Sequence, residues 1–121
     1  MIFFGIDISK YKHDCHIVTS FGDVLNDGFS FTNNAEGFRQ LQAQLELCND
    51  EVRIGFEATG NYGINLKLFL EKIGFDYMEI NPLLVKEHIK SISLRRTTTD
   101  KLSARAIAGY LTLQRTQYKK N

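Results

Sequence analysis

Residues 2–9 read IFFGIDIS and residues 52–59 read VRIGFEAT, and each apolar run leads into a carboxylate. Short runs rich in aromatic and β-branched residues are typical of buried strands. Asp7 and Glu57 therefore end two strands at the rim of a sheet, and they converge if the strands pair. Close carboxylates repel each other unless a cation lies between them, so a divalent metal is one interpretation. The alternative is that each acid caps an unrelated helix or turn.

The rest of the chain predicts the order β-β-β-α-β-α-β-α. Asn33 and Glu36 form a capping box for the first helix, and Asn81-Pro82 opens a later one. Asp100 lies at or near the start of the final helix, where it either caps that helix or faces a metal. The expected strands are residues 2–7, 12–19, 24–31, 52–56 and 75–80. This order resembles that of an α/β ribonuclease-H-like domain with a five-stranded mixed sheet, in which the first and fourth strands are neighbours.

Charge is unevenly distributed along the 121 residues, although the net charge is only +1. Residues 1–85 are acidic and residues 86–121 are basic, which suggests a polyanion partner beside an acidic site. A solvated basic surface is the alternative. The predicted nucleic-acid contacts in this basic part are Lys86, Lys90, Arg95, Arg96, Lys101 and Arg105.

Cys15 and Cys48 have no metal-ligand spacing and are expected to be free thiols in a reducing compartment. The sequence shows no secretion signal and no stretch long enough to span a membrane. These features predict a cytoplasmic protein with no membrane partner.

Four segments resemble, in order and spacing, the RuvC-like N-terminal domain of the DEDD insertion-sequence transposases, a group that includes the Piv-type DNA invertases. They are GIDISK (5–10), GFEATGNY (55–62), NPLLVK (81–86) and TTTDKLSARAIA (97–108). The resemblance implies four carboxylates that hold Mg²⁺ or Mn²⁺ for DNA strand cleavage and exchange. Asp7, Glu57 and Asp100 match three of them.

The fourth acid of the family pattern falls on Ser103, a neutral residue that binds Mg²⁺ less well than a carboxylate does. The chain is then a weakened or inactive copy of the family's catalytic domain, or another acid takes the place of the fourth one. Asp14 is a poor substitute on the expectation that it lies inside the second strand, away from the rim.

The resemblance covers residues 2 to about 113, so we expect a RuvC-like domain over residues 1–114 and a tail or the start of a linker over residues 115–121. Full-length relatives continue into a domain with a nucleophilic serine, so this chain alone is expected to be inactive. The implied partners are DNA, a structured guide RNA and, in the full-length protein, further copies of the chain. Two other interpretations stay open: a non-catalytic nucleic-acid-binding or dimerisation module, and an actin-like kinase half-domain, because FGIDIS resembles a phosphate loop.

Overall fold

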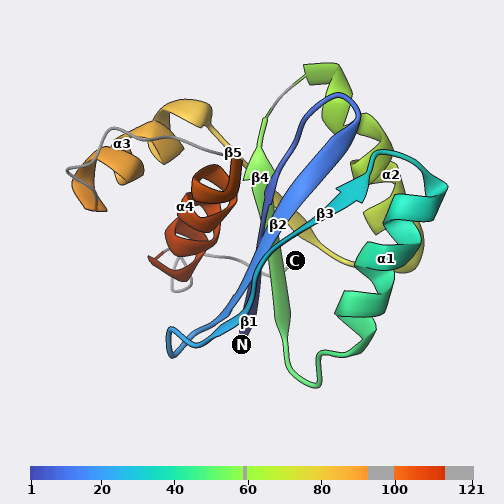
Figure 1. Cartoon of the computed structure of the whole chain (residues 1–121), viewed down its shortest axis with the longest axis horizontal. Helices are drawn as coiled ribbons and strands as arrows, with labels where there is room; N and C mark the ends of the chain where they lie inside the picture. Colours follow the sequence, from blue (N-terminus) through green and yellow to red (C-terminus); the bar gives the residue numbers. More distant parts are fainter. Residues whose placement is uncertain (59, 93–99, 114–121) are drawn as a thin grey trace.

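A computed structural model describes residues 1–58, 60–92 and 100–113 of the chain. Its centre is a five-stranded mixed sheet in the order β3-β2-β1-β4-β5 (Figure 1). β1 pairs in parallel with β4 and antiparallel with β2, and β5 extends the parallel part of the sheet. The predicted neighbourhood of the first and fourth strands is therefore confirmed. The strands are β1 (Ile2–Asp7), β2 (Lys12–Thr19), β3 (Val24–Thr32), β4 (Val52–Glu57) and β5 (Tyr77–Ile80).

Helices cover both faces of the sheet (Figure 1). On one face α1 (Ala35–Glu46) and α2 (Ile64–Ile73) pack against alternate residues of β1 and β4. On the other face lie α3 (Pro82–Ile92) and α4 (Asp100–Leu113). A 3-10 turn, η1 (Gly60–Gly63), joins β4 to α2. The larger core, on the α1 and α2 face, includes Phe4, Ile6, Leu41, Ile54, Phe56, Leu66 and Leu70.

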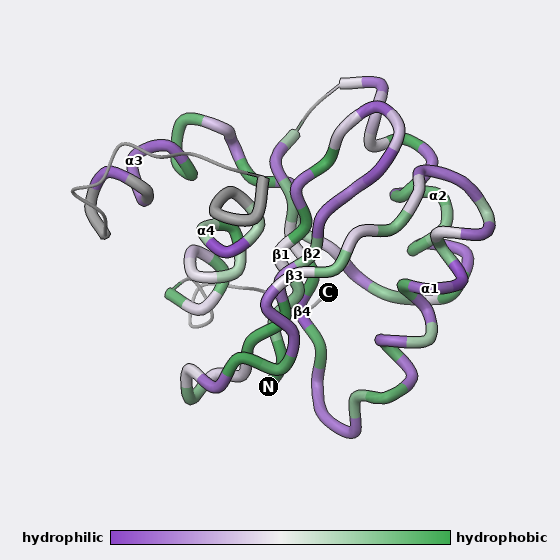
Figure 2. Tube along the Cα trace, viewed as in Figure 1, coloured by the Kyte–Doolittle hydropathy of each residue, from purple (hydrophilic) through white to green (hydrophobic). Residues whose placement is uncertain are grey.

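The second core, on the α3 and α4 face, contains Phe3, Ile80, Val85, Ile107 and Leu111. Phe3 and Phe4 are adjacent in sequence and belong to different cores because successive strand residues point to opposite faces. A strand covered on both faces becomes almost continuously apolar, which accounts for the run IFFGI. Figure 2 shows this hydropathy pattern, with hydrophobic residues gathered in the central strands and hydrophilic residues along the outer loops.

Some expected element boundaries differ from the structure. β3 and β4 each end one residue later than expected, at Thr32 and Glu57. The N-cap of α1 is Asn34, whose side chain accepts the N–H of Gly37, so the capping box predicted at Asn33 and Glu36 is wrong by one residue. β5 begins at Tyr77, two residues later than expected. Residues 93–99, which include the predicted contacts Arg95 and Arg96, lie outside the described residues. Within the described part of the chain, none of the helices combines the length and apolar character needed to cross a membrane.

Candidate functional site

Asp7 and Glu57 end two neighbouring parallel strands at the same level. The last pair in the register of β1 and β4 is Ile6 with Phe56, and the two acids follow this pair. Ile6 and Phe56 lie in the core beneath α1 and α2, so strand alternation assigns Asp7 and Glu57 to the opposite face, which α4 covers. Both acids are half-buried. The predicted pairing of their strands is confirmed, and their role as metal ligands stays a prediction.

The position of Glu57 is partly shielded from water, and burial raises the pKa of its carboxyl group. Removal from water disfavours the charged form of a carboxyl group, which is the cause of this shift. A cation beside such a carboxylate gains more Coulomb energy than it would in bulk water. Glu57 therefore has the electrostatic environment of a residue that benefits from a positive partner.

Two glycines bring α4 directly onto the sheet beside the acids. Gly5 and Gly55 are partners in the register of β1 and β4, and each lies two residues before an acid. A Cβ atom on Gly5 would lie 2.4 Å from the backbone nitrogen of Ala108 and 2.5 Å from the carbonyl oxygen of Ala104. The helix backbone therefore touches β1 where a side chain would otherwise separate them. These glycines were not singled out from the sequence, although the repeated pattern Gly-x-acid in GID and GFE is a signal that could have identified them.

The remaining predicted metal residues are at the start of α4. Asp100 is the first residue of this helix and Ser103 lies in its first turn. Their side chains lie outside the described residues, so the structure gives the backbone position of this turn alone. An α-helix has 3.6 residues per turn, so position 100 is about one turn before Ala104, which touches Gly5.

The expectation that Asp14 lies away from the rim is wrong. In the antiparallel register of β1 and β2, Asp14 is the direct partner of Asp7. Three carboxylates, Asp14, Asp7 and Glu57, thus end up level with one another on three adjacent strands. The sequence misplaced Asp14 because an antiparallel strand starts where its predecessor ends, so an early residue of β2 lies beside the last residue of β1. The Asp14 carboxylate accepts a hydrogen bond from the Ser30 hydroxyl on β3, on the side of β2 away from Glu57.

Among the described residues, no group of three or more His, Cys, Asp or Glu side chains is close enough to hold a metal ion. Asp7 and Glu57, the predicted ligands, carry carboxylate oxygens, which are the hard donors that suit Mg²⁺ and Mn²⁺. A further ligand would have to come from elsewhere, such as the first turn of α4.

The predicted nucleic-acid contacts have different surroundings. Lys86 and Lys90 are exposed on α3. Arg105 on α4 is ion-paired with Asp27 on β3, with distances of 2.9 and 3.2 Å from one guanidinium nitrogen to the two carboxylate oxygens. Arg95 and Arg96 and the side chain of Lys101 lie outside the described residues. Among the predicted contacts whose side chains the structure describes, Lys86 and Lys90 are thus the ones available to bind phosphate groups.

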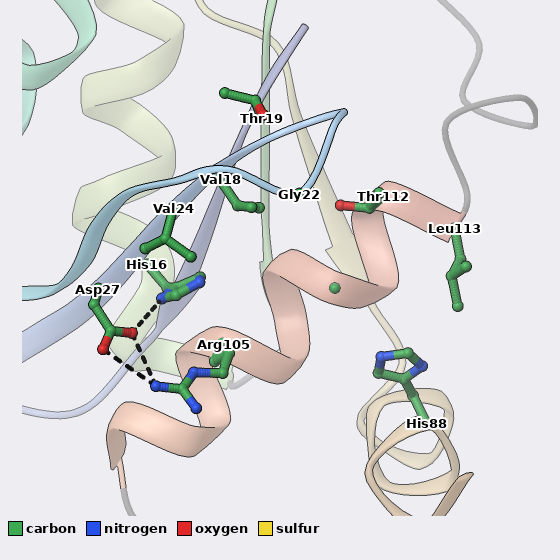
Figure 3. A pocket seen from close by; sticks show the side chains of 11 residues that line it. His16, Val18, Thr19, Gly22, Val24, Asp27, His88, Arg105, Thr112 and Leu113 are labelled. Carbon is green, nitrogen blue, oxygen red and sulfur yellow. Dashed lines mark hydrogen bonds and ion pairs between the residues drawn. The ribbon is translucent and has the colours of Figure 1, made fainter. Parts of the chain in front are cut away.

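Arg105 belongs to a polar cluster that sequence reasoning missed. A groove of about 630 Å³ lies between the β2–β3 hairpin, α3 and α4. Figure 3 shows Asp27 between His16 and Arg105 at one end of this groove. Nδ1 of His16 lies 3.2 Å from Asp27, without the alignment of a regular hydrogen bond. Burial lowers the pKa of His16. Because Asp27 already neutralises Arg105, this cluster joins the hairpin to α4 and presents little surplus positive charge.

Comparisons with known proteins agree with this geometry. A model of the IS110 DEDD transposase family matches residues 4–120. The structure is similar to RuvC from Thermus thermophilus, with a TM-score of 0.66 and 16% sequence identity over 97% of this chain and 96% of that one. It is also similar to T. thermophilus RuvC in complex with a Holliday junction substrate, with a TM-score of 0.64 and 12% identity over the same shares of the two chains. No curated protein matches the sequence significantly. The RuvC matches show the fold, which is ribonuclease-H-like as predicted.

Proposed function

The chain belongs to the IS110 DEDD transposase family, and on this premise we propose that it is a metal-dependent domain for DNA strand cleavage and exchange. Family and fold together support a domain for nucleic-acid cleavage or recombination. The observation that carries the finer proposal is the level placement of Asp7 and Glu57 at the ends of adjacent parallel strands.

Asp7 and Glu57 would hold Mg²⁺ or Mn²⁺ through their carboxylate oxygens. When bound, such ions supply the positive charge that stabilises the attacking and leaving oxygens of a phosphodiester displacement. The pairing of β1 with β4 brings the two carboxylates level with each other, and the partial burial of Glu57 limits competition from water. The close contact of α4 with Gly5 supports Asp100 as a third ligand from the first turn of this helix.

DNA is the proposed partner. One structural neighbour is described in complex with a Holliday junction, a branched DNA. The exposed Lys86 and Lys90 are one turn apart on α3 and suit contacts with phosphate groups, which carry no sequence information. A structured guide RNA, self-association of the full-length protein and a cytoplasmic location stay predictions.

Calorimetric titration with Mn²⁺ tests this proposal. Asp7→Asn and Glu57→Gln should each weaken binding by about tenfold or more, because changing even a residue that only supports metal ligands has an effect of this size. Asp76→Asn is the control, because this exposed carboxylate lies four residues before Ile80, the β5 residue that is level with Glu57. Equal losses in all three variants, or no loss at Asp7 and Glu57, would contradict the proposed site.

A second candidate function, a non-catalytic nucleic-acid-binding module, is favoured by one observation, the serine at position 103 where the family pattern has an acid. Mn²⁺ titration of the wild type and of Ser103→Asp separates the two functions. In a catalytic domain that is weakened at this position, the added carboxylate should tighten Mn²⁺ binding. A binding module should bind branched DNA and show the same Mn²⁺ affinity in both forms.

A further inference from the structure

Asn33 lies where the segments that follow the two acids meet. Its side-chain nitrogen Nδ2 is 3.2 Å from the carbonyl oxygen of Lys10 and 3.4 Å from that of Tyr62 and donates to both. Its backbone N–H donates to the carbonyl oxygen of Tyr11 at 2.9 Å. Lys10 and Tyr11 lie in the turn after Asp7, and Tyr62 lies in η1, shortly after Glu57. One residue at the end of β3 thus connects two segments about fifty residues apart in the sequence.

His13 anchors this connection in the core. Its Nδ1 accepts the backbone N–H of Ser9 at 3.2 Å, so the neutral ring carries its proton on Nε2. Burial lowers the pKa of His13, and a side-chain hydrogen bond with Asn33 opposes part of this lowering. That bond is imperfectly aligned, because neither Nε2 of His13 nor Oδ1 of Asn33 has a partner of regular geometry among the described residues. The ring is fully buried and packs edge-on against Phe31 at 5.3 Å.

The next residue, Asn34, has a different role. Its Oδ1 accepts the N–H of Gly37 at 3.0 Å and the hydroxyl of Thr32 at 2.8 Å, which caps α1. Capping therefore does not occupy the side chain of Asn33, whose amide is directed to the two loops. The two consecutive asparagines thus have different roles: Asn34 caps α1, and Asn33 connects the two loops.

We propose that Asn33 is a positioning residue, which holds the loops after Asp7 and Glu57 together and thereby sets the separation of the two carboxylates for a divalent ion. This inference rests on the proposed function, because it concerns the same pair of acids. Losing a direct hydrogen-bond partner of a metal ligand typically lowers metal affinity by about 10- to 100-fold. Asn33 acts on the two acids through the loops that follow them, so its effect should lie at the lower end of this range.

The adjacent asparagines provide a matched pair of variants for the test. Asn33→Asp and Asn34→Asp make the same chemical change and add the same charge one residue apart. Aspartate caps a helix about as well as asparagine, so Asn34→Asp should retain both α1 and Mn²⁺ affinity. A carboxylate at position 33 has no N–H to donate to Lys10 and Tyr62, so Asn33→Asp should weaken Mn²⁺ binding by about tenfold.

Amide hydrogen exchange in metal-free protein gives an independent measurement. Exchange should become faster at Ser9 and in η1 in Asn33→Asp, and it should not change there in Asn34→Asp. If Asn33→Asp does not fold, Asn33→Ala against Asn34→Ala makes the same comparison without an added charge.

The outcomes separate this inference from the proposed function. Failure of the wild type to bind Mn²⁺ would refute the proposed function and, with it, the role of Asn33 in setting a metal site, even if exchange confirmed the loop connection. Mn²⁺ binding by the wild type with equal affinity and equal exchange in the two Asp variants would refute the role of Asn33 alone. Selective loss of affinity and of protection in Asn33→Asp would support it.

Discussion

Alanine at position 5 should force α4 away from β1. The new Cβ would lie 2.4 Å from the backbone nitrogen of Ala108 and 2.5 Å from the carbonyl oxygen of Ala104. Backbone atoms cannot rotate away as the end of a side chain can, so the helix has to retreat. A shift of about 1 Å is needed to restore the 3.4 Å at which ordinary contact begins.

Overpacking of this kind typically costs about 1–3 kcal/mol, and Gly5→Ala should be at the upper end because a helix backbone must move. We expect the free energy of unfolding to fall by about 3 kcal/mol, which lowers Tm by about 12 °C at about 4 °C per kcal/mol for a domain of this size. Gly55→Ala is the control: its Cβ would lie 2.5–2.9 Å from the two methyl carbons and Cγ of Leu111, a side chain that can change its conformation without moving the helix backbone. It should cost only about 1 kcal/mol.

Urea and thermal unfolding followed by circular dichroism measure both variants. The smaller conformational freedom of alanine in the unfolded chain affects both alike and cancels in the comparison. Gly5→Ala should also reduce Mn²⁺ affinity more than Gly55→Ala, because retreat of α4 moves its first turn away from Asp7. Equal losses of stability, or a larger loss in Gly55→Ala, would refute the contact between the α4 backbone and Gly5.

Two further predictions concern charge. Because burial raises the pKa of Glu57 in the folded state, the free energy of unfolding should fall as pH rises from the ordinary pKa of glutamate through the raised one. Glu57→Gln should remove this fall. Metal-free unfolding curves measured from pH 4 to 7 that do not differ between the two proteins would contradict this prediction. Lys86→Glu with Lys90→Glu should weaken binding to all DNA sequences alike and reduce the salt slope by about two, about one for each lost phosphate contact. Fluorescence anisotropy at several salt concentrations measures this, and an unchanged slope would exclude both lysines from the interface.

The sequence predicted the central arrangement because the relevant signals are local. The apolar runs that lead into Asp7 and Glu57 identify two strands, and the order of the elements then makes these strands neighbours. Connections between strands follow few topologies, so element order constrains which strands pair. The pairing of β1 with β4 was predictable for this reason.

The features that sequence reasoning missed depend on contacts between distant residues. Asn33 and Asn34 carry the same side chain, so the sequence does not show which of them caps α1. Asn33 contacts Lys10 and Tyr62, and Asn34 caps the helix. The proximity of Asp14 to Asp7 depends on the register of a hairpin, which the apolar pattern of β2 does not specify alone. The contact of Gly5 with α4 requires the three-dimensional packing of the helix.

The central claim is that Asp7 and Glu57 hold one divalent ion between them. Paramagnetic broadening of backbone amide signals by substoichiometric Mn²⁺ measures this most directly, because the effect falls steeply with distance from the ion. The account predicts the strongest broadening at residues 7–9, at residues 57–58 and in the first turn of α4, with loss of this pattern in Asp7→Asn. Broadening centred on other carboxylates, such as the exposed Asp50 or Glu71, and unchanged in Asp7→Asn would contradict it.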